Sequence, residues 1–207
     1  MHRTGRIAVA TFVSLACVGL AVEAEAVPTG IGTCRTINQP GSYVLRRNLT
    51  SAGTCLVVNA DFVTIDLNGF VIAGDGTGVG VTDNSVTRRG TVIHGGSITN
   101  FAVGILMDIS SGTHVHHMRV VGNAGAGIVV DAGSTVTDNI ANGNLDGIIL
   151  SVSGSTVRDN ITYGNANAGM IVSCPSNIIG NTSMNNSGGG LIMVGAGCNS
   201  SNNVIVP

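Results

Sequence analysis

Four histidines of the sequence lie close together, as His94 and the cluster His114-Val115-His116-His117. Side chains alternate between the two faces of a β-strand, so His114 and His116 would share one face of a strand. Imidazole binds transition metals and exchanges protons near neutral pH. The cluster therefore predicts a metal site formed by His94, His116 and His117. The alternative is the polar outer face of a sheet, without any bound metal.

A second candidate site is acidic. Asp108 and Asp131 each follow an aliphatic segment at equivalent places in the sequence, and Asn84 precedes them at a similar place. Two carboxylates brought close together would raise the pKa of one of them or bind a cation. Such a pair could act as general acid and general base. The alternative is that both aspartates are solvated turn residues.

Regular columns of asparagine and glycine surround these candidates. In one column asparagine recurs every 21 residues, at Asn123, Asn144, Asn165 and Asn186. In a second column it recurs at the same interval, at Asn139, Asn160, Asn181 and Asn202. A glycine followed by an aliphatic residue begins each unit, at Gly104, Gly127, Gly147, Gly169 and Gly190. Self-similarity at a period near twenty residues is typical of a solenoid.

The unit favours β-structure, because no segment shows apolar residues at helical spacing over three turns. Three short strands and three turns per unit predict an all-β, right-handed, single-stranded parallel β-helix solenoid of about seven coils of about 21 residues. Each asparagine amide has donors and acceptors, so stacked asparagines can form a ladder that stabilises the turns. This register would place His94 beside His116 and align Asp138 with His117.

The aliphatic segment at the start of each unit is apolar on both faces of the predicted strand. We expect one set of side chains to point outward: Leu106, Val129, Ile149, Ile171 and Ile192. A contiguous apolar stripe on a surface suggests an interface. The stripe therefore predicts a homo-oligomer or another protein partner.

The first 26 residues predict a secretory signal peptide. Arg3 and Arg6 precede an apolar run at residues 7–22, and Ala24-Glu25-Ala26 resembles a cleavage site. This run is short for a membrane span, although a retained anchor is the rival interpretation. We therefore expect a secreted protein, extracellular or periplasmic, with no membrane span after cleavage.

After residue 26 the chain keeps four cysteines, Cys34, Cys55, Cys174 and Cys198. An even number of cysteines in an exported chain favours disulfides over free thiols. Three pairings exist, and the proximity of neighbouring coils favours Cys34–Cys55 and Cys174–Cys198. We expect residues 27–55 to form an N-terminal cap and residues 56–207 to form the β-helix, as one domain.

Charge excludes one class of partner. The chain has nine Lys and Arg residues against eleven Asp and Glu residues, a net charge of −2. All nine cations are arginines, and they are scattered rather than clustered. Because nucleic-acid binding needs a basic patch or stripe, we expect no nucleic-acid partner.

The repeat unit and the opening of the mature chain resemble the right-handed parallel β-helix repeat proteins of the pectate-lyase-like superfamily. The opening residues that carry the resemblance are Cys34, Pro40-Gly41-Ser42-Tyr43, Asn48-Leu49, Cys55 and Val63-Thr64-Ile65-Asp66-Leu67-Asn68-Gly69-Phe70. The resemblance implies the fold, and it implies a choice among lyases, hydrolases, adhesins and inert rods. For a lyase it also implies Ca²⁺ at an acidic cluster and an acidic polysaccharide as substrate.

The sequence departs from the enzymes of that superfamily. Its turns are short, and it lacks Gly-His-Gly, Arg-Ile-Lys and Asn-Thr-Asp motifs. It also contains no lysine, which excludes a lysine-based lyase. We therefore expect a non-catalytic binding or structural module for a protein partner or a surface polysaccharide. The alternative is a small polysaccharide lyase or glycoside hydrolase centred on Asp108 and Asp131 or on the histidines.

Overall fold

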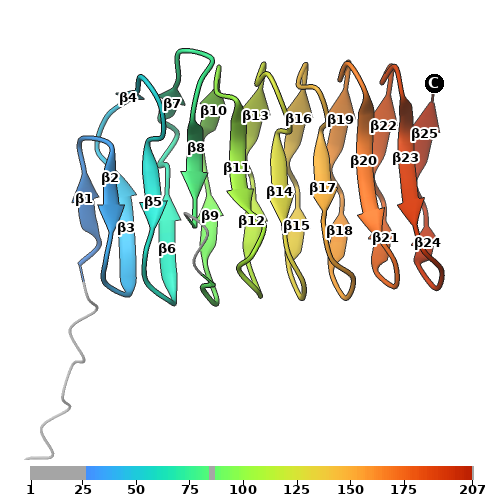
Figure 1. Cartoon of the computed structure of the whole chain (residues 1–207), viewed down its shortest axis with the longest axis horizontal. Coiled ribbons are helices and arrows are strands. Elements are labelled where there is room, and N and C mark those ends of the chain that lie inside the picture. The colour runs from blue at the N-terminus through green and yellow to red at the C-terminus, as the bar shows by residue number, and fades with distance from the viewer. Residues whose placement is uncertain (1–26, 84–86, 207) are drawn as a thin grey trace, which may run out of the picture.

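The structure, a computed structural model, describes residues 27–83 and 87–206. It is a parallel β-solenoid in the form of a straight rod, with the strands of successive turns stacked side by side along its length (Figure 1). The expected signal peptide at residues 1–26, and Asn84, lie outside the described residues.

Three parallel sheets run along the rod, and each turn of the chain contributes one strand to each sheet. Sheet 1 contains the glycine-aliphatic segments: β2 (Arg35–Ile37), β5 (Leu56–Val58), β8 (Val79–Thr82), β11 (Val103–Met107), β14 (Ile128–Val130), β17 (Ile148–Leu150), β20 (Ala168–Ser173) and β23 (Gly189–Val194). Sheet 2 contains the histidines: β1 (Thr29–Ile31), β3 (Gly41–Leu45), β6 (Val63–Asp66), β9 (Val92–His94), β12 (His114–His116), β15 (Thr135–Thr137), β18 (Thr156–Arg158), β21 (Asn177–Ile179) and β24 (Asn199–Ser201).

Sheet 3 completes each turn: β4 (Leu49–Thr50), β7 (Val71–Ala73), β10 (Ser97–Thr99), β13 (Arg119–Val121), β16 (Ile140–Asn142), β19 (Ile161–Tyr163), β22 (Thr182–Met184) and β25 (Val204–Val206). The rod has about eight turns, close to the seven expected. Residues 27–55, where we expected a cap, contribute β1–β4 to the same three sheets. No helix occurs in the described part of the chain, so none of it forms a helix that could cross a membrane.

Inward side chains of Val, Ile, Leu and Met fill the narrow core. On sheet 1 the residues that alternate with the expected outward stripe are fully buried through four successive strands: Ile105 and Met107, Ile128 and Val130, Ile148 and Leu150, and Met170 and Val172. Met193, which follows the outward Ile192 in the same alternation, is 51% exposed because β23 is the last strand of its sheet in the structure. The period-two pattern therefore predicted the buried face correctly, except in the last turn.

Asparagine ladders fill the turns on both sides of sheet 3. In the turn from sheet 2, the Oδ1 of Asn160 accepts hydrogen bonds from the backbone and the amide of Asn139, both at 3.0 Å. Asn160 makes the same pair of bonds to Asn181. The column from Asn123 to Asn186 repeats this arrangement in the turn back to sheet 1. These buried side chains confirm the expected ladders.

Two details of the ladders differ from the prediction. The last rung of the column that begins at Asn139 is Asn203 rather than Asn202, because the final turn has one more residue than the strict repeat. Asn203 Oδ1 accepts both bonds from Asn181. The left-handed backbone lies on the residue that precedes each rung rather than on the rung itself. That preceding residue is His117, Asp138, Asp159, Gly180 or Asn202, each with φ between 53° and 67°.

A large apolar residue begins each ladder. One turn before Asn123 its place in the column is taken by Phe101, and one turn before Asn139 the equivalent place is taken by Met118. Phe101 donates its backbone N–H to Oδ1 of Asn123, and Met118 donates its backbone N–H to Oδ1 of Asn139. A Cβ on Gly74 would lie 2.7 Å from the Phe101 ring, so the glycine makes room for that side chain. Both disulfides have the predicted pairing, Cys34–Cys55 and Cys174–Cys198, and each links neighbouring turns near one end of the rod.

Candidate metal centre

The histidines gather on the outer face of sheet 2. In the strand register His94 of β9 is the direct neighbour of His116 of β12, as the columns predict. Their rings are stacked, with centroids 4.8 Å apart and planes 6° from parallel. His114 points to the same face of β12, and its ring centroid lies 4.4 Å from that of His116. The fold thus brings three imidazoles into contact on one surface.

His117 joins this group from the turn that follows β12. Its backbone is left-handed, with φ of 53°. Its Nδ1 lies 2.8 Å from the Nδ1 of His116, with the two rings nearly perpendicular. One of the two nitrogens must carry a proton for this contact to be a hydrogen bond. Two metal–nitrogen bonds of about 2.0 Å at a right angle would place their nitrogens at about the same separation.

His94 faces a different partner. Its Nδ1 lies 3.6 Å from Oδ1 of Asp66, which also accepts the backbone N–H of Asn68. Of the three predicted metal ligands, only His116 and His117 therefore have converging nitrogens. Throughout residues 27–83 and 87–206, no group of three or more His, Cys, Asp or Glu side chains could hold a metal ion. The protein thus provides at most a two-nitrogen site here.

The pKa of His116 falls from its ordinary value of 6.5 to about 4. Desolvation by burial is the main cause, and the neighbouring imidazoles of His114, His94 and His117 disfavour a further positive charge. The pKa of His114 is also lowered, again mainly by burial. Asp138 opposes the shift for both residues, but more weakly. His116 is therefore a neutral imidazole, the form that binds metals, well below neutral pH.

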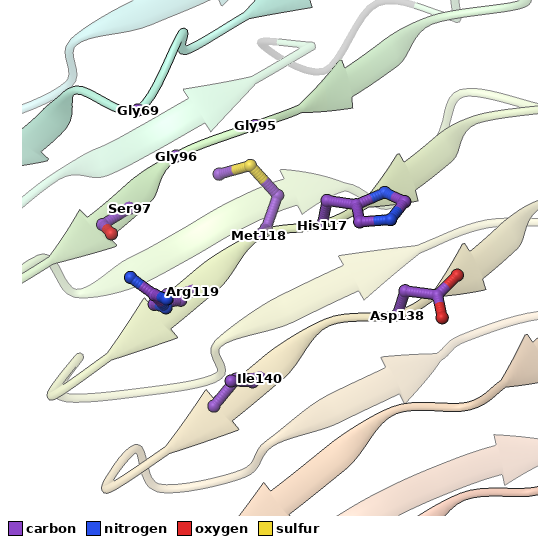
Figure 2. Close-up of a pocket in the computed structure, with 9 residues that line it drawn as sticks. All are labelled: Gly69, Gly95, Gly96, Ser97, His117, Met118, Arg119, Asp138 and Ile140. Carbon is purple, nitrogen blue, oxygen red and sulfur yellow. The ribbon is translucent and has the colours of Figure 1, made fainter.

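A pocket of about 340 Å³ adjoins His117 at the turn between sheets 2 and 3. Figure 2 shows the residues that line it: Gly69, Gly95, Gly96, Ser97, His117, Met118, Arg119, Asp138 and Ile140. Asp138 stands one turn along the rod from His117, as the columns predict. The repeat pattern does not predict this pocket, because the pocket depends on glycines of two earlier turns.

The aspartate site has less structural support. Asp108 is exposed after β11, and Asp131 is half-buried after β14. Oδ1 of Asp131 is buried without a hydrogen-bond partner in the described structure. Between the two carboxylates we find no shared hydrogen-bond partner among the described residues. Catalysis by Asp108 and Asp131 stays a prediction.

The aliphatic stripe does face outward on sheet 1. Leu106, Ile149 and Ile171 are half-buried, Ile192 is 37% exposed, and Val129 is only 8% exposed. The outer face of sheet 3 carries more exposed apolar side chains, including Val121, Ile161 and Tyr163. These residues could not be predicted from the regular aliphatic segments, because they lie on a different sheet. An interface at the stripe stays a prediction.

The fold and the histidine cluster together define a class: a parallel β-solenoid with a candidate transition-metal centre on one outer face. Comparison with known families is more specific. Residues 50–206, more than half of the chain, match the family described as "Periplasmic copper-binding protein (NosD)", and the chain belongs to this family. No curated protein and no solved structure matches the chain. A periplasmic family agrees with the two disulfides, which fit an extracytoplasmic location.

Proposed function

We propose that this protein is a non-catalytic periplasmic binding protein that holds a copper ion between the Nδ1 atoms of His116 and His117. The separation of 2.8 Å between these two nitrogens is the observation that carries the proposal. Imidazole nitrogens suit copper, whereas Ca²⁺ requires oxygen ligands, so the donor set favours copper over the Ca²⁺ of a lyase-type site. The family description supplies the same metal.

The neighbouring imidazoles support the site without coordinating the ion. The rings of His94 and His114 lie against the ring of His116 and restrict its rotation. Copper binding must displace the proton shared by His116 and His117, because both nitrogens become ligands. The lowered pKa of His116 reduces the competition from a second proton. Two protein ligands leave the remaining copper positions open to water or to an external ligand.

Calorimetric titration of the metal-free protein with Cu²⁺ tests this proposal. We expect binding of one ion at micromolar protein concentration. The substitutions His116→Asn and His117→Asn should each weaken it at least about tenfold, since each removes one of two nitrogen ligands. Asparagine tolerates the left-handed backbone at residue 117, so the second substitution should preserve the turn.

Asp159→Asn is the matched control. Asp159 has the same left-handed backbone two turns along the rod, with φ of 55°, but it has no ring nitrogen and contacts Arg158 instead. Its substitution should leave copper affinity unchanged. Absence of binding in the unsubstituted protein, or equal affinity in a protein that lacks both His116 and His117, would refute the proposal.

A further inference from the structure

A carboxylate lies beside the histidine pair. His117 and Asp138 follow β12 and β15 at equivalent places, because His116 and Thr137 are direct neighbours in the strand register. Both residues have left-handed backbones, with φ of 53° and 57°. Neighbouring strands of a sheet lie about 4.8 Å apart, so the two backbones are one strand spacing from each other. Figure 2 shows the imidazole of His117 and the carboxylate of Asp138 extending to the same side, the right of the view.

The negative charge of Asp138 is not compensated by the protein. One turn further along the rod, Asp159 occupies the same place in the column, and its carboxylate lies 3.5 Å from Nε of Arg158. The residue before Asp138 is Thr137 rather than an arginine, so the equivalent contact cannot form there. Asp138 forms no ion pair with any other residue that the structure describes. A cation held at the neighbouring histidines would provide the missing positive charge.

The electric field of Asp138 reaches the imidazoles. Burial is the main cause of the lowered pKa of His114 and of His116, and Asp138 opposes this lowering in both residues. Its carboxylate therefore favours positive charge where the Nδ1 atoms of His116 and His117 would hold an ion. Asp138 does not complete a three-residue ligand set, since the described residues contain no group of three or more His, Cys, Asp or Glu side chains that could hold a metal. Its effect on a bound ion must act through space or through water.

We propose that Asp138 is the charge partner of the copper site: its carboxylate lies outside the ligand set and stabilises the double positive charge of Cu²⁺ held by His116 and His117. This inference rests on the proposed copper site. Two neutral imidazoles leave the charge of Cu²⁺ at +2, whereas the nearby carboxylate reduces the net charge of the region to +1. Attraction between such charges weakens as salt screens it, and residues outside the ligand set commonly change metal affinity by about tenfold or more.

The substitution Asp138→Asn tests this inference. It removes the charge but keeps a side chain of nearly the same shape, and asparagine suits the left-handed backbone. Cu²⁺ is titrated into the variant and into the unsubstituted protein at low and at high concentrations of potassium nitrate. We expect the variant to bind Cu²⁺ about tenfold more weakly at low salt, and we expect this difference to shrink at high salt. A structural defect would instead weaken binding by the same factor at both concentrations.

Asp159→Asn is the control, because Asp159 has the same backbone conformation but already pairs with Arg158. It should change neither the affinity nor its salt dependence. Electron paramagnetic resonance of copper-loaded Asp138→Asn should still show coupling to two imidazoles. Equal affinity of this variant and the unsubstituted protein, a loss of affinity that is independent of salt, or loss of an imidazole coupling would overturn the inference. Absence of Cu²⁺ binding in the unsubstituted protein would instead refute the proposed function, and this inference with it.

Discussion

His116 is the residue on which the candidate centre depends. It lies between His94 of the preceding turn and Thr137 of the following turn, and it contacts His114 and His117 within its own turn. Its position beside His94 could be predicted from the repeat, because the register alone determines which residues are neighbours. The convergence of its nitrogen with that of His117 could not, because it depends on a left-handed turn residue and on side-chain rotamers.

Acid should destabilise the protein through this histidine. The pKa of His116 is about 4 in the folded protein and 6.5 in an unfolded chain, so between these values the unfolded state binds more protons. The free energy of unfolding should therefore fall as pH is lowered from 6.5 toward 4. We expect a loss of about 1 kcal/mol rather than the full value of the shift, because the imidazole remains partly in solvent.

Urea unfolding at a series of pH values between 7.5 and 4 measures this effect. The substitution His116→Asn should make the pH dependence shallower, and Asp159→Asn should leave the histidine contribution in place. A free energy of unfolding that falls equally steeply in the His116→Asn variant would show that other groups cause the acid sensitivity.

At the scale of the element, the turn between sheets 2 and 3 is the repeated unit that matters. From His117 to Asn181, each of these turns pairs one left-handed residue with one buried residue in the ladder column. His117 and Met118 occupy these two positions in one turn, and Asp138 and Asn139 occupy them in the next. The ladder therefore starts immediately beyond the histidine cluster. The left-handed position carries the exposed side chains that line the pocket, while the ladder position fixes the register.

Removal of one rung should strongly destabilise the protein. Asn160 is 1% exposed; its Nδ2 donates to the carbonyl of Val136 and to Asn181, and its Oδ1 accepts two bonds from Asn139. Asn160→Ala would leave several of these buried groups unsatisfied, at about 1–3 kcal/mol each, so we expect a loss of about 3 kcal/mol or more. Chemical denaturation measures this loss.

Asn177→Ala provides the control for this prediction. Asn177 is an exposed residue of β21, outside the ladders, and its substitution should change the free energy of unfolding by less than about 0.5 kcal/mol. Similar losses in the two variants would mean that the asparagine ladder contributes no special stability.

At the scale of the whole molecule, the fold follows from a few repeated spacings. The 21-residue columns and the period-two aliphatic segments were sufficient to predict a parallel solenoid, its buried face and both disulfides. They could not predict Asn203 as the last rung, because one additional residue in the final turn shifts the column. They also could not predict the pocket, which needs glycines and charged side chains from several turns at the same place.

The rod explains why the candidate sites lie on its surface. Aliphatic side chains fill the core of the rod, so functional groups gather where outward side chains of successive turns lie side by side. The histidines lie side by side on sheet 2, and the pocket adjoins them at the edge of sheet 3 (Figure 2). Membership of a periplasmic copper-binding family agrees with a role for this surface in metal binding.

Electron paramagnetic resonance of the protein loaded with one equivalent of Cu²⁺ tests the central claim most directly. Coupling of the copper spin to imidazole nitrogen reports how many histidines bind the ion. We predict coupling to two imidazoles in the unsubstituted protein, to one in His117→Asn, and an unchanged spectrum in Asp159→Asn. A spectrum without imidazole coupling, or one that is the same after His116 and His117 are both replaced, would contradict a copper site at this pair.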